Sequence, residues 1–88
     1  MAKVLIYLTA ACPYCQAALR LLERKGITDV ELVRVDFEPA RRAEMTQRSR
    51  LTTVPQIWVD GRHVGGCDEL YALDRAGALD RLLESERI

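Results

Sequence analysis

Apolar and polar positions divide the first half of the chain into two strands and two helices. The unbroken apolar run at residues 4–8 predicts a central strand that is buried on both faces. Apolar side chains then recur at helical spacing over residues 13–25, and Gly26 is well suited to end that helix. Residues 31–36 alternate and predict a second strand, and a helix with few apolar residues is expected over 39–49.

The second half of the chain predicts a hairpin followed by two helices. Strands are expected at residues 56–59 and 62–64, joined by the two-residue turn Asp60-Gly61. Asp68 is expected to cap the first of the two helices, and the last helix is expected over residues 78–86.

This order of elements predicts an α/β fold. Two strands joined by a helix run parallel with a right-handed crossover, and the hairpin adds antiparallel strands to the same sheet. Helices are then expected to cover both faces of that sheet. A chain of 88 residues is long enough for one hydrophobic core but not for two, so we expect a single domain over residues 1–88.

Composition and charge argue against several classes of function. The chain has 13 basic and 13 acidic residues, so no excess of positive charge points to nucleic acid. No apolar run approaches the roughly 20 residues that cross a bilayer, and the N-terminus lacks the pattern of a signal peptide. An odd number of cysteines cannot form a complete disulfide framework, so we expect a reducing, cytoplasmic location and cysteines used for chemistry.

The segment Cys12-Pro13-Tyr14-Cys15 places two thiols at the junction of a strand and a helix. Proline suits the first helical turn, whose unpaired N–H groups and positive dipole end favour a thiolate at Cys12. A thiolate is the attacking species in disulfide exchange, so Cys12 is the expected nucleophile. Cys15 lies one turn further, facing the sheet, and is expected to be a less exposed, resolving thiol. A zinc site is disfavoured, because only Cys67 and His63 remain as ligands and they form no second close pair.

Two further segments, Thr53-Val54-Pro55 and Gly65-Gly66-Cys67-Asp68, suggest a place for a substrate. Pro55 keeps Val54 extended, which leaves the Val54 N–H and C=O free to pair with an extended thiol substrate. The simpler interpretation is a rigid entry to the strand. In the second segment, glycine allows close approach to the backbone, and the helix start offers N–H groups to a carboxylate. Asp68 can cap that helix, accept a hydrogen bond from a substrate ammonium group, or both.

These three segments, in this order and spacing, resemble the glutaredoxins of the thioredoxin-fold superfamily, and the resemblance covers nearly the whole chain. It implies a thioredoxin-like fold with a four-stranded mixed sheet in the order 2-1-3-4. It also implies glutathione-dependent reduction of protein disulfides and of protein–glutathione mixed disulfides, with no metal required. Ribonucleotide reductase is one acceptor that the resemblance suggests, and we expect a monomer.

The resemblance also implies roles for individual residues. Cys12 would be the nucleophile and Cys15 the resolving thiol. The cysteine backbone of glutathione would pair with Val54, and the bond from Val54 to the following proline would be cis. The γ-glutamyl carboxylate would bind the N–H groups of Cys67 and Asp68, with the ammonium group near the Asp68 side chain. The implied glutathione-binding residues are Tyr14, Arg42, Thr53, Val54, Pro55, Gly66, Cys67 and Asp68.

One position departs from the family pattern. Glutaredoxins usually carry a lysine three residues before the first active-site cysteine, and this chain has Thr9 there. We expect Cys12 to keep the helix start that favours its thiolate but to lose one contribution from positive charge. Arg42, with Arg41 or Arg48 behind it, is the expected substitute for contact with the glycine carboxylate of glutathione.

Two other functions stay open at this point. A redoxin of the same fold could take electrons from thioredoxin reductase, although residues 65–68 fit the charged end of glutathione. A dimer could hold a [2Fe–2S] cluster through Cys12 of each subunit and two glutathiones, although cluster-binding relatives usually have a smaller residue at the position of Pro13. Cys67 is expected to act through its backbone, with an oxidation-sensitive thiol as the alternative. His63 is expected to face solvent.

Overall fold

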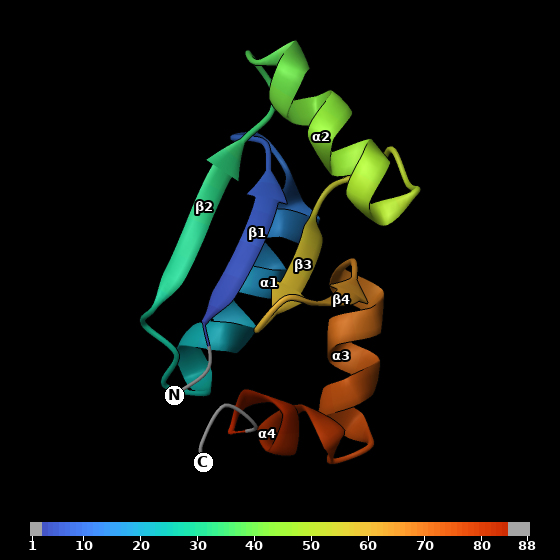
Figure 1. Ribbon diagram of the computed structural model, residues 1–88. Coiled ribbons are helices and arrows are strands. Elements are labelled where there is room, and N and C mark those ends of the chain that lie inside the picture. The colour runs from blue at the N-terminus through green and yellow to red at the C-terminus, as the bar shows by residue number, and fades with distance from the viewer. Residues whose placement is uncertain (1–2, 85–88) are drawn as a thin grey trace.

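The computed structural model describes residues 3–84, and its helices and strands follow the predicted order (Figure 1). The strands are β1 (Val4–Leu8), β2 (Val30–Arg34), β3 (Gln56–Val59) and β4 (Arg62–Gly65). The helices are α1 (Pro13–Arg24), α2 (Pro39–Ser49), α3 (Cys67–Arg75) and α4 (Ala78–Leu83). Within these described residues, no helix has the length and apolar content needed to cross a membrane.

The strands form one mixed sheet in the predicted order β2-β1-β3-β4. β1 pairs in parallel with β2, where Ile6 lies opposite Leu32, and antiparallel with β3, where Ile6 lies opposite Ile57. β4 pairs antiparallel with β3, and their register shifts between Ile57 and Trp58. The central place of β1 explains its unbroken apolar run, because both of its faces are covered.

Helices cover both faces of the sheet, as predicted (Figure 1). On one face, alternate residues of β1 pack with α1, α3 and α4 in the larger core cluster. Its buried members are Val4, Ile6, Leu8, Cys15, Ala18, Leu21, Leu22, Ile27, Ile57, Val59, Leu70, Leu79 and Leu83. On the other face, α2 contributes Met45 to a smaller cluster with Tyr7, Val35 and Trp58. Each large aliphatic side chain buried in this way contributes about 1.5–3 kcal/mol to stability.

Local signals set both ends of α1. Cys12 is extended and caps the helix, and Pro13 occupies the first turn, where its missing N–H costs no hydrogen bond. At the other end Gly26 takes a positive φ of 78°, and the Ile27 N–H donates to the Leu22 carbonyl at 3.1 Å. The helix ends at Arg24, one residue before the predicted end.

The predicted second strand ran two residues too far and began one residue late. β2 spans Val30–Arg34, whereas residues 31–36 were expected. Asp36 leaves the strand direction and accepts a hydrogen bond from the Ala10 N–H at 3.1 Å. Its carboxylate also pairs with the Arg34 guanidinium at 2.6 Å. These contacts fix the loop that leads from β1 into α1.

The expected cap of α3 was also wrong. Gly66 is the N-cap, and the Glu69 carboxylate accepts a hydrogen bond from the Gly66 N–H at 2.8 Å. Asp68 is therefore the second residue of the helix, and its side chain does not cap it. The last helix ends at Leu83, and the predicted end at residue 86 lies outside the described residues.

Candidate active site

Cys12 lies where β1 leads into α1, and its sulfur caps the helix. Its Sγ accepts a hydrogen bond from the Cys15 N–H at 3.2 Å. The side chain is half-buried, and Sγ lies 3.9 Å from the Val54 carbonyl oxygen, which belongs to a distant part of the chain. The N–H donor and the positive end of the helix dipole both favour negative charge on this sulfur.

Cys15 lies one turn into α1 and belongs to the larger core cluster. Its side chain is fully buried, which agrees with the prediction that it is less exposed than Cys12. Burial raises the pKa of Cys15 to about 12, and its hydrogen bond with Cys12 contributes to that rise. Cys15 therefore stays protonated at neutral pH, while Cys12 is the more accessible thiol of the pair.

A groove of about 400 Å³ lies beside Cys12, and it shares Val54 with the surroundings of that sulfur. Its lining residues come from the start of α1, the segment before β3 and the start of α3. They are Tyr14, Thr53, Val54, Pro55, Gly66, Cys67, Asp68 and Glu69. The structure thus brings together every predicted glutathione-binding residue except Arg42, and it adds Glu69.

The bond between Val54 and Pro55 is cis, as the resemblance implied. This segment meets the start of α3 closely, because a Cβ at Gly66 would lie 3.3 Å from the Pro55 carbonyl oxygen. Glycine at that position therefore lets the two walls of the groove approach each other. Tyr14 is exposed at the edge of the same groove.

The start of α3 offers N–H groups to an anion. Backbone N–H groups in the first turn of a helix have no partner within it, and the helix dipole adds positive potential there. The N–H groups of Cys67 and Asp68 belong to this turn, whereas Glu69 occupies that of Gly66. The Cys67 side chain is buried, and burial, followed by the negative charge of Asp68, raises the pKa of its thiol. The Cys67 thiol therefore ionises less readily than an exposed cysteine.

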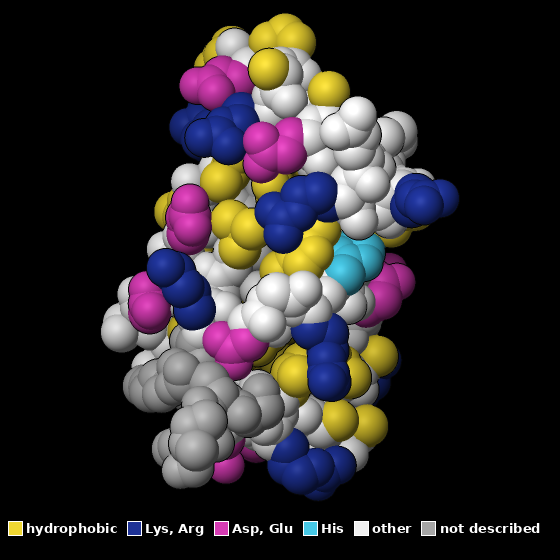
Figure 2. Space-filling view, in the orientation of Figure 1, with side chains coloured by type: hydrophobic (Ala, Val, Ile, Leu, Met, Phe, Trp, Pro, Cys, Tyr) yellow, Lys and Arg dark blue, Asp and Glu magenta, His cyan; other side chains and the backbone are white. Residues whose placement is uncertain are grey.

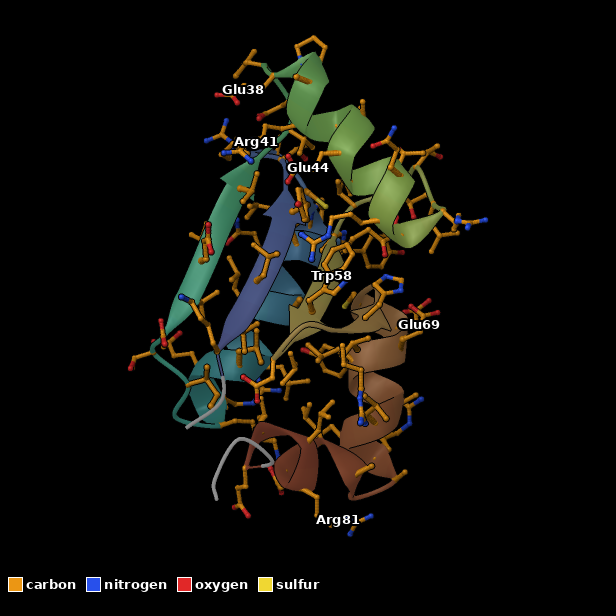
Figure 3. The ribbon with its side chains drawn as sticks, viewed as in Figure 1. Glu38, Arg41, Glu44, Trp58, Glu69 and Arg81 are labelled. Atoms are coloured by element: carbon orange, nitrogen blue, oxygen red, sulfur yellow. The ribbon has the colours of Figure 1, made fainter. Side chains whose placement is uncertain are left out.

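Arg42 does not line the groove but contacts the segment that leads into it. Its Nη1 donates to the Thr52 carbonyl at 3.0 Å, next to the groove residue Thr53. The structure places the two expected helpers elsewhere. Arg41 donates to Glu44 at 3.2 Å (Figure 3), and the Arg48 guanidinium lies 4.6 Å above the Trp58 ring.

Sequence reasoning missed the neighbours of Thr53. His63 is exposed, as predicted, but its Nε2 lies 2.8 Å from Oε1 of Gln56, which is 1% exposed. The Gln56 amide in turn donates to Thr53. A polar residue at the start of a buried strand was the available signal, because a buried amide requires partners.

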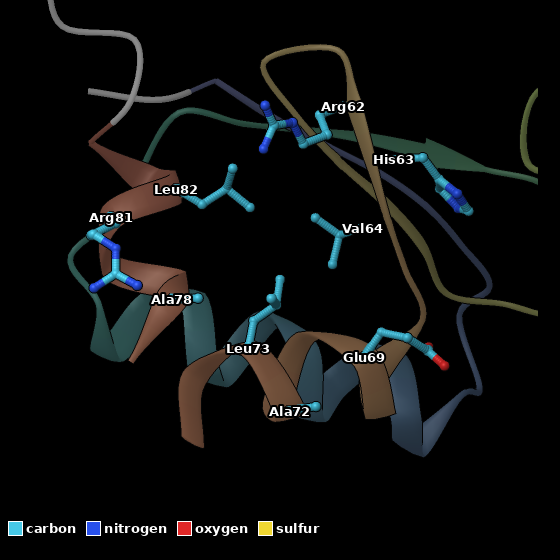
Figure 4. Close-up of a pocket in the computed structure, with 9 residues that line it drawn as sticks. All are labelled: Arg62, His63, Val64, Glu69, Ala72, Leu73, Ala78, Arg81 and Leu82. Atoms are coloured by element: carbon cyan, nitrogen blue, oxygen red, sulfur yellow. The ribbon is translucent and has the colours of Figure 1, made fainter. Parts of the chain in front are cut away.

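A second hollow of about 650 Å³ lies between β4, α3 and α4 (Figure 4). Its lining residues are mostly aliphatic and include neither of the paired cysteines. The thiol chemistry therefore belongs to the smaller groove. Across residues 3–84, no group of three or more His, Cys, Asp or Glu side chains is arranged to hold a metal ion.

A thioredoxin-like sheet with two thiols at one helix start defines a thiol–disulfide oxidoreductase. The glutaredoxin family model matches residues 4–64, and the chain belongs to the glutaredoxin family. It is 53% identical to a glutaredoxin of Pseudomonas aeruginosa over 85 residues, which cover 97% of this chain and 100% of the relative. It is 54% identical to glutaredoxin 3 of Escherichia coli over 84 residues, which cover 96% of this chain and 100% of the relative.

Solved structures agree with the fold. The solution structure of a glutaredoxin from Brucella melitensis has a TM-score of 0.85 and 45% identity, covering 100% of this chain and 95% of that one. A crystal structure of a buckwheat glutaredoxin–glutathione complex has a TM-score of 0.87 and 26% identity, covering 96% of this chain and 78% of that one. The predicted thioredoxin-like α/β fold is thereby confirmed.

Proposed function

We propose that this chain is a glutathione-dependent oxidoreductase that reduces protein–glutathione mixed disulfides and protein disulfides. One observation carries the proposal: the sulfur that caps α1 lies beside a groove that runs from Val54 to the start of α3. An extended backbone and a helix start match the peptide backbone and the anionic end of glutathione. The buckwheat relative of the same fold was crystallised with glutathione, which supports this ligand.

The groove suggests how glutathione binds. The cysteine of glutathione pairs through its backbone with Val54, which brings the glutathione sulfur next to Cys12. Its γ-glutamyl carboxylate accepts hydrogen bonds from the N–H groups of Cys67 and Asp68, and its ammonium group lies near the Asp68 carboxylate. Arg42 stabilises this pose through the Thr52 carbonyl and adds positive charge toward the glycine end.

Reduction of a protein–glutathione mixed disulfide uses Cys12 and does not require Cys15. The Cys12 thiolate attacks the glutathione sulfur of the mixed disulfide. The old S–S bond breaks, and the protein thiolate leaves and takes up a proton. Cys12 is then bonded to glutathione. A second glutathione, as thiolate, attacks the bound glutathione sulfur, so that glutathione disulfide leaves and the Cys12 thiolate returns.

Reduction of a protein disulfide requires Cys15 as well. Cys12 attacks one sulfur and forms a mixed disulfide with the protein, and Cys15 then loses its proton and attacks Cys12 Sγ. The substrate leaves as a thiol, and the Cys12–Cys15 disulfide closes. Two causes that raise the pKa of Cys15, its hydrogen bond with Cys12 and the charge of Cys12, disappear once Cys12 is in a disulfide. Cys15 is therefore easier to deprotonate when it is needed.

We place this activity in a cytoplasmic monomer, with ribonucleotide reductase among the acceptors. Basic and acidic side chains are interspersed on the face in view (Figure 2), so that face has no large patch of one charge for a strongly charged partner. No metal takes part in any step above.

A glutathionylated peptide, glutathione, glutathione reductase and NADPH test the proposal. Wild type and Cys15→Ser should both release the peptide thiol, and Cys12→Ser should not. Cys15→Ser should lose reduction of a protein disulfide. Turnover with thioredoxin reductase in place of glutathione would show the other redoxin class. A coloured protein after anaerobic cluster reconstitution would support the cluster-binding dimer instead.

A further inference from the structure

Gln56 connects the surface histidine to the wall of the groove. Its buried amide nitrogen Nε2 lies 3.0 Å from the Thr53 carbonyl oxygen and 3.3 Å from Thr53 Oγ1. Its amide oxygen Oε1 lies 2.8 Å from His63 Nε2. Thr53 lines the groove, whereas His63 lines the second hollow, and Gln56 lies in contact with both residues. The three side chains therefore form one continuous row of hydrogen bonds from the surface to the groove.

The Thr53 carbonyl sets the direction of this row. A carbonyl oxygen can only accept, so it requires the NH₂ end of the Gln56 amide and excludes the oxygen end. The amide oxygen of Gln56 must then face His63. That oxygen also only accepts, so His63 must present an N–H at Nε2. The polarity of the whole row follows from one backbone oxygen.

The same logic fixes the proton of the Thr53 hydroxyl. Thr53 Oγ1 accepts a hydrogen bond from the Gln56 amide nitrogen, which also donates to the Thr53 carbonyl. Its own proton must then point away from that nitrogen, because two donor hydrogens cannot share one contact. Thr53 is exposed and lines the groove, which is where an acceptor can meet this proton.

Aromatic packing holds the histidine ring in place. The rings of His63 and Trp58 have centroids 4.7 Å apart and are tilted by 40°. Trp58 is in turn covered by the Arg48 guanidinium at 4.6 Å from the ring centroid. The histidine, cyan in Figure 2, lies at the surface beside hydrophobic, basic and acidic side chains. The imidazole is therefore kept at Gln56 although it is exposed.

We propose that His63 and Gln56 form a positioning relay that makes Thr53 a hydrogen-bond donor to the ligand. The relay runs from His63 Nε2–H to Gln56 Oε1, and from the Gln56 amide to Thr53 Oγ1. The Thr53 hydroxyl then donates to a carboxylate or carbonyl oxygen of the bound thiol peptide. This inference rests on the proposed glutathione function and adds a determinant of which ligand groups the groove accepts.

The tautomer of His63 tests the relay without any activity. His63 is the single histidine of the chain, so its ring nitrogens can be observed by NMR without overlap. Once the imidazole is neutral, the proton should reside on Nε2 in the wild type. A Gln56→Leu variant that stays folded should show both tautomers. A proton on Nδ1 in the wild type would overturn the relay, whether or not the protein uses glutathione.

Kinetics then test the effect on the ligand. His63→Phe keeps a ring against Trp58 but removes the N–H, and it should raise KM for a glutathionylated peptide about threefold to tenfold. Its kcat and the alkylation rate of Cys12 should stay within about twofold. His63→Gln restores an N–H donor and should recover most of the loss. Arg62→Gln, on the same strand, is the matched control and should leave KM unchanged.

A double-variant cycle separates a relay from independent effects. Thr53→Val removes the hydroxyl at nearly constant shape, so its combination with His63→Phe should be no worse than Thr53→Val alone. Additive losses, or an unchanged KM in His63→Phe, would refute the relay. If the wild type has no glutathione-dependent turnover, the proposed function fails, while the tautomer result still decides the relay.

Discussion

Alkylation should separate the cysteines by rate, because burial and helix position differ among them. With a pKa of about 12, only about one Cys15 in 100,000 carries a thiolate at pH 7, since each pKa unit is a factor of ten. An unperturbed cysteine, with a pKa of about 8.5, is about 3% thiolate at the same pH. Thiolate fraction alone therefore slows Cys15 by about a thousandfold or more relative to a free cysteine. Cys67 should also react slowly, because its thiol is buried and its pKa is raised.

The assay is timed alkylation of the reduced protein with iodoacetamide at neutral pH, followed by acid quenching and mass spectrometry. Fragment ions distinguish Cys12 from Cys15, which share one tryptic peptide. A parallel reaction in denaturant gives the rate of each cysteine without the fold. Cys12 should react faster than in denaturant, and Cys15 should react far more slowly. If Cys15 reacts within about tenfold of Cys12, the division of roles between the two thiols is refuted.

Three further predictions concern the loop, the acid range and the groove. Thr9→Lys adds a cation before Cys12 and should raise its alkylation rate at neutral pH, and an unchanged or lower rate would contradict the expectation. The Arg34 guanidinium lowers the pKa of Asp36 from 3.8 to about 2. The ionised Asp36 carboxylate therefore stabilises the folded protein above about pH 4, and this contribution is lost as pH falls toward 2. In urea unfolding, the free energy of unfolding of Asp36→Asn should fall less steeply between about pH 4 and about pH 2 than that of the wild type. Gly66→Ala places a methyl group 3.3 Å from the Pro55 carbonyl oxygen and should raise KM several-fold, with about 0.5–1 kcal/mol of lost stability in thermal unfolding. An unchanged KM in Gly66→Ala would contradict the prediction that the added methyl group narrows the groove.

The elements with strong local signals could be predicted from the sequence. β1 and β3 were predicted with their observed bounds. β1 is a short apolar run, and β3 has three consecutive apolar residues between Pro55 and the turn at Asp60-Gly61. The end of β2 could not be predicted, since alternation continues past Arg34. What ends the strand is the turn of Asp36 toward Ala10, a contact between residues 26 positions apart. The cap of α3 did have a signal, because Glu69 stands three residues after Gly66.

The residues that line the groove were predicted better than the long side chains that contact the groove segments from behind. The lining comes from segments with glycine or proline, whose backbone restrictions are visible in the sequence. The contacts from behind depend on long side chains, whose direction a sequence does not show. Arg42 reaches the Thr52 carbonyl rather than the groove wall, and Arg48 covers Trp58 on the α2 face of the sheet. The contact between Gln56 and His63 depends on pairing across the hairpin, where the register shifts.

The geometry of α1 explains why one thiol can act alone and the other cannot. The donor that caps Cys12 is the backbone N–H of Cys15, not its sulfur. Serine at position 15 keeps that N–H, so Cys15→Ser leaves the main stabilisation of the Cys12 thiolate in place. Serine at position 12 removes the nucleophile, and the remaining thiol is buried with a raised pKa. Cys15→Ser removes the thiol that interacts with Cys12 but keeps the backbone N–H and the helix start. Its loss of protein-disulfide reduction therefore measures chiefly the chemistry of the second thiol.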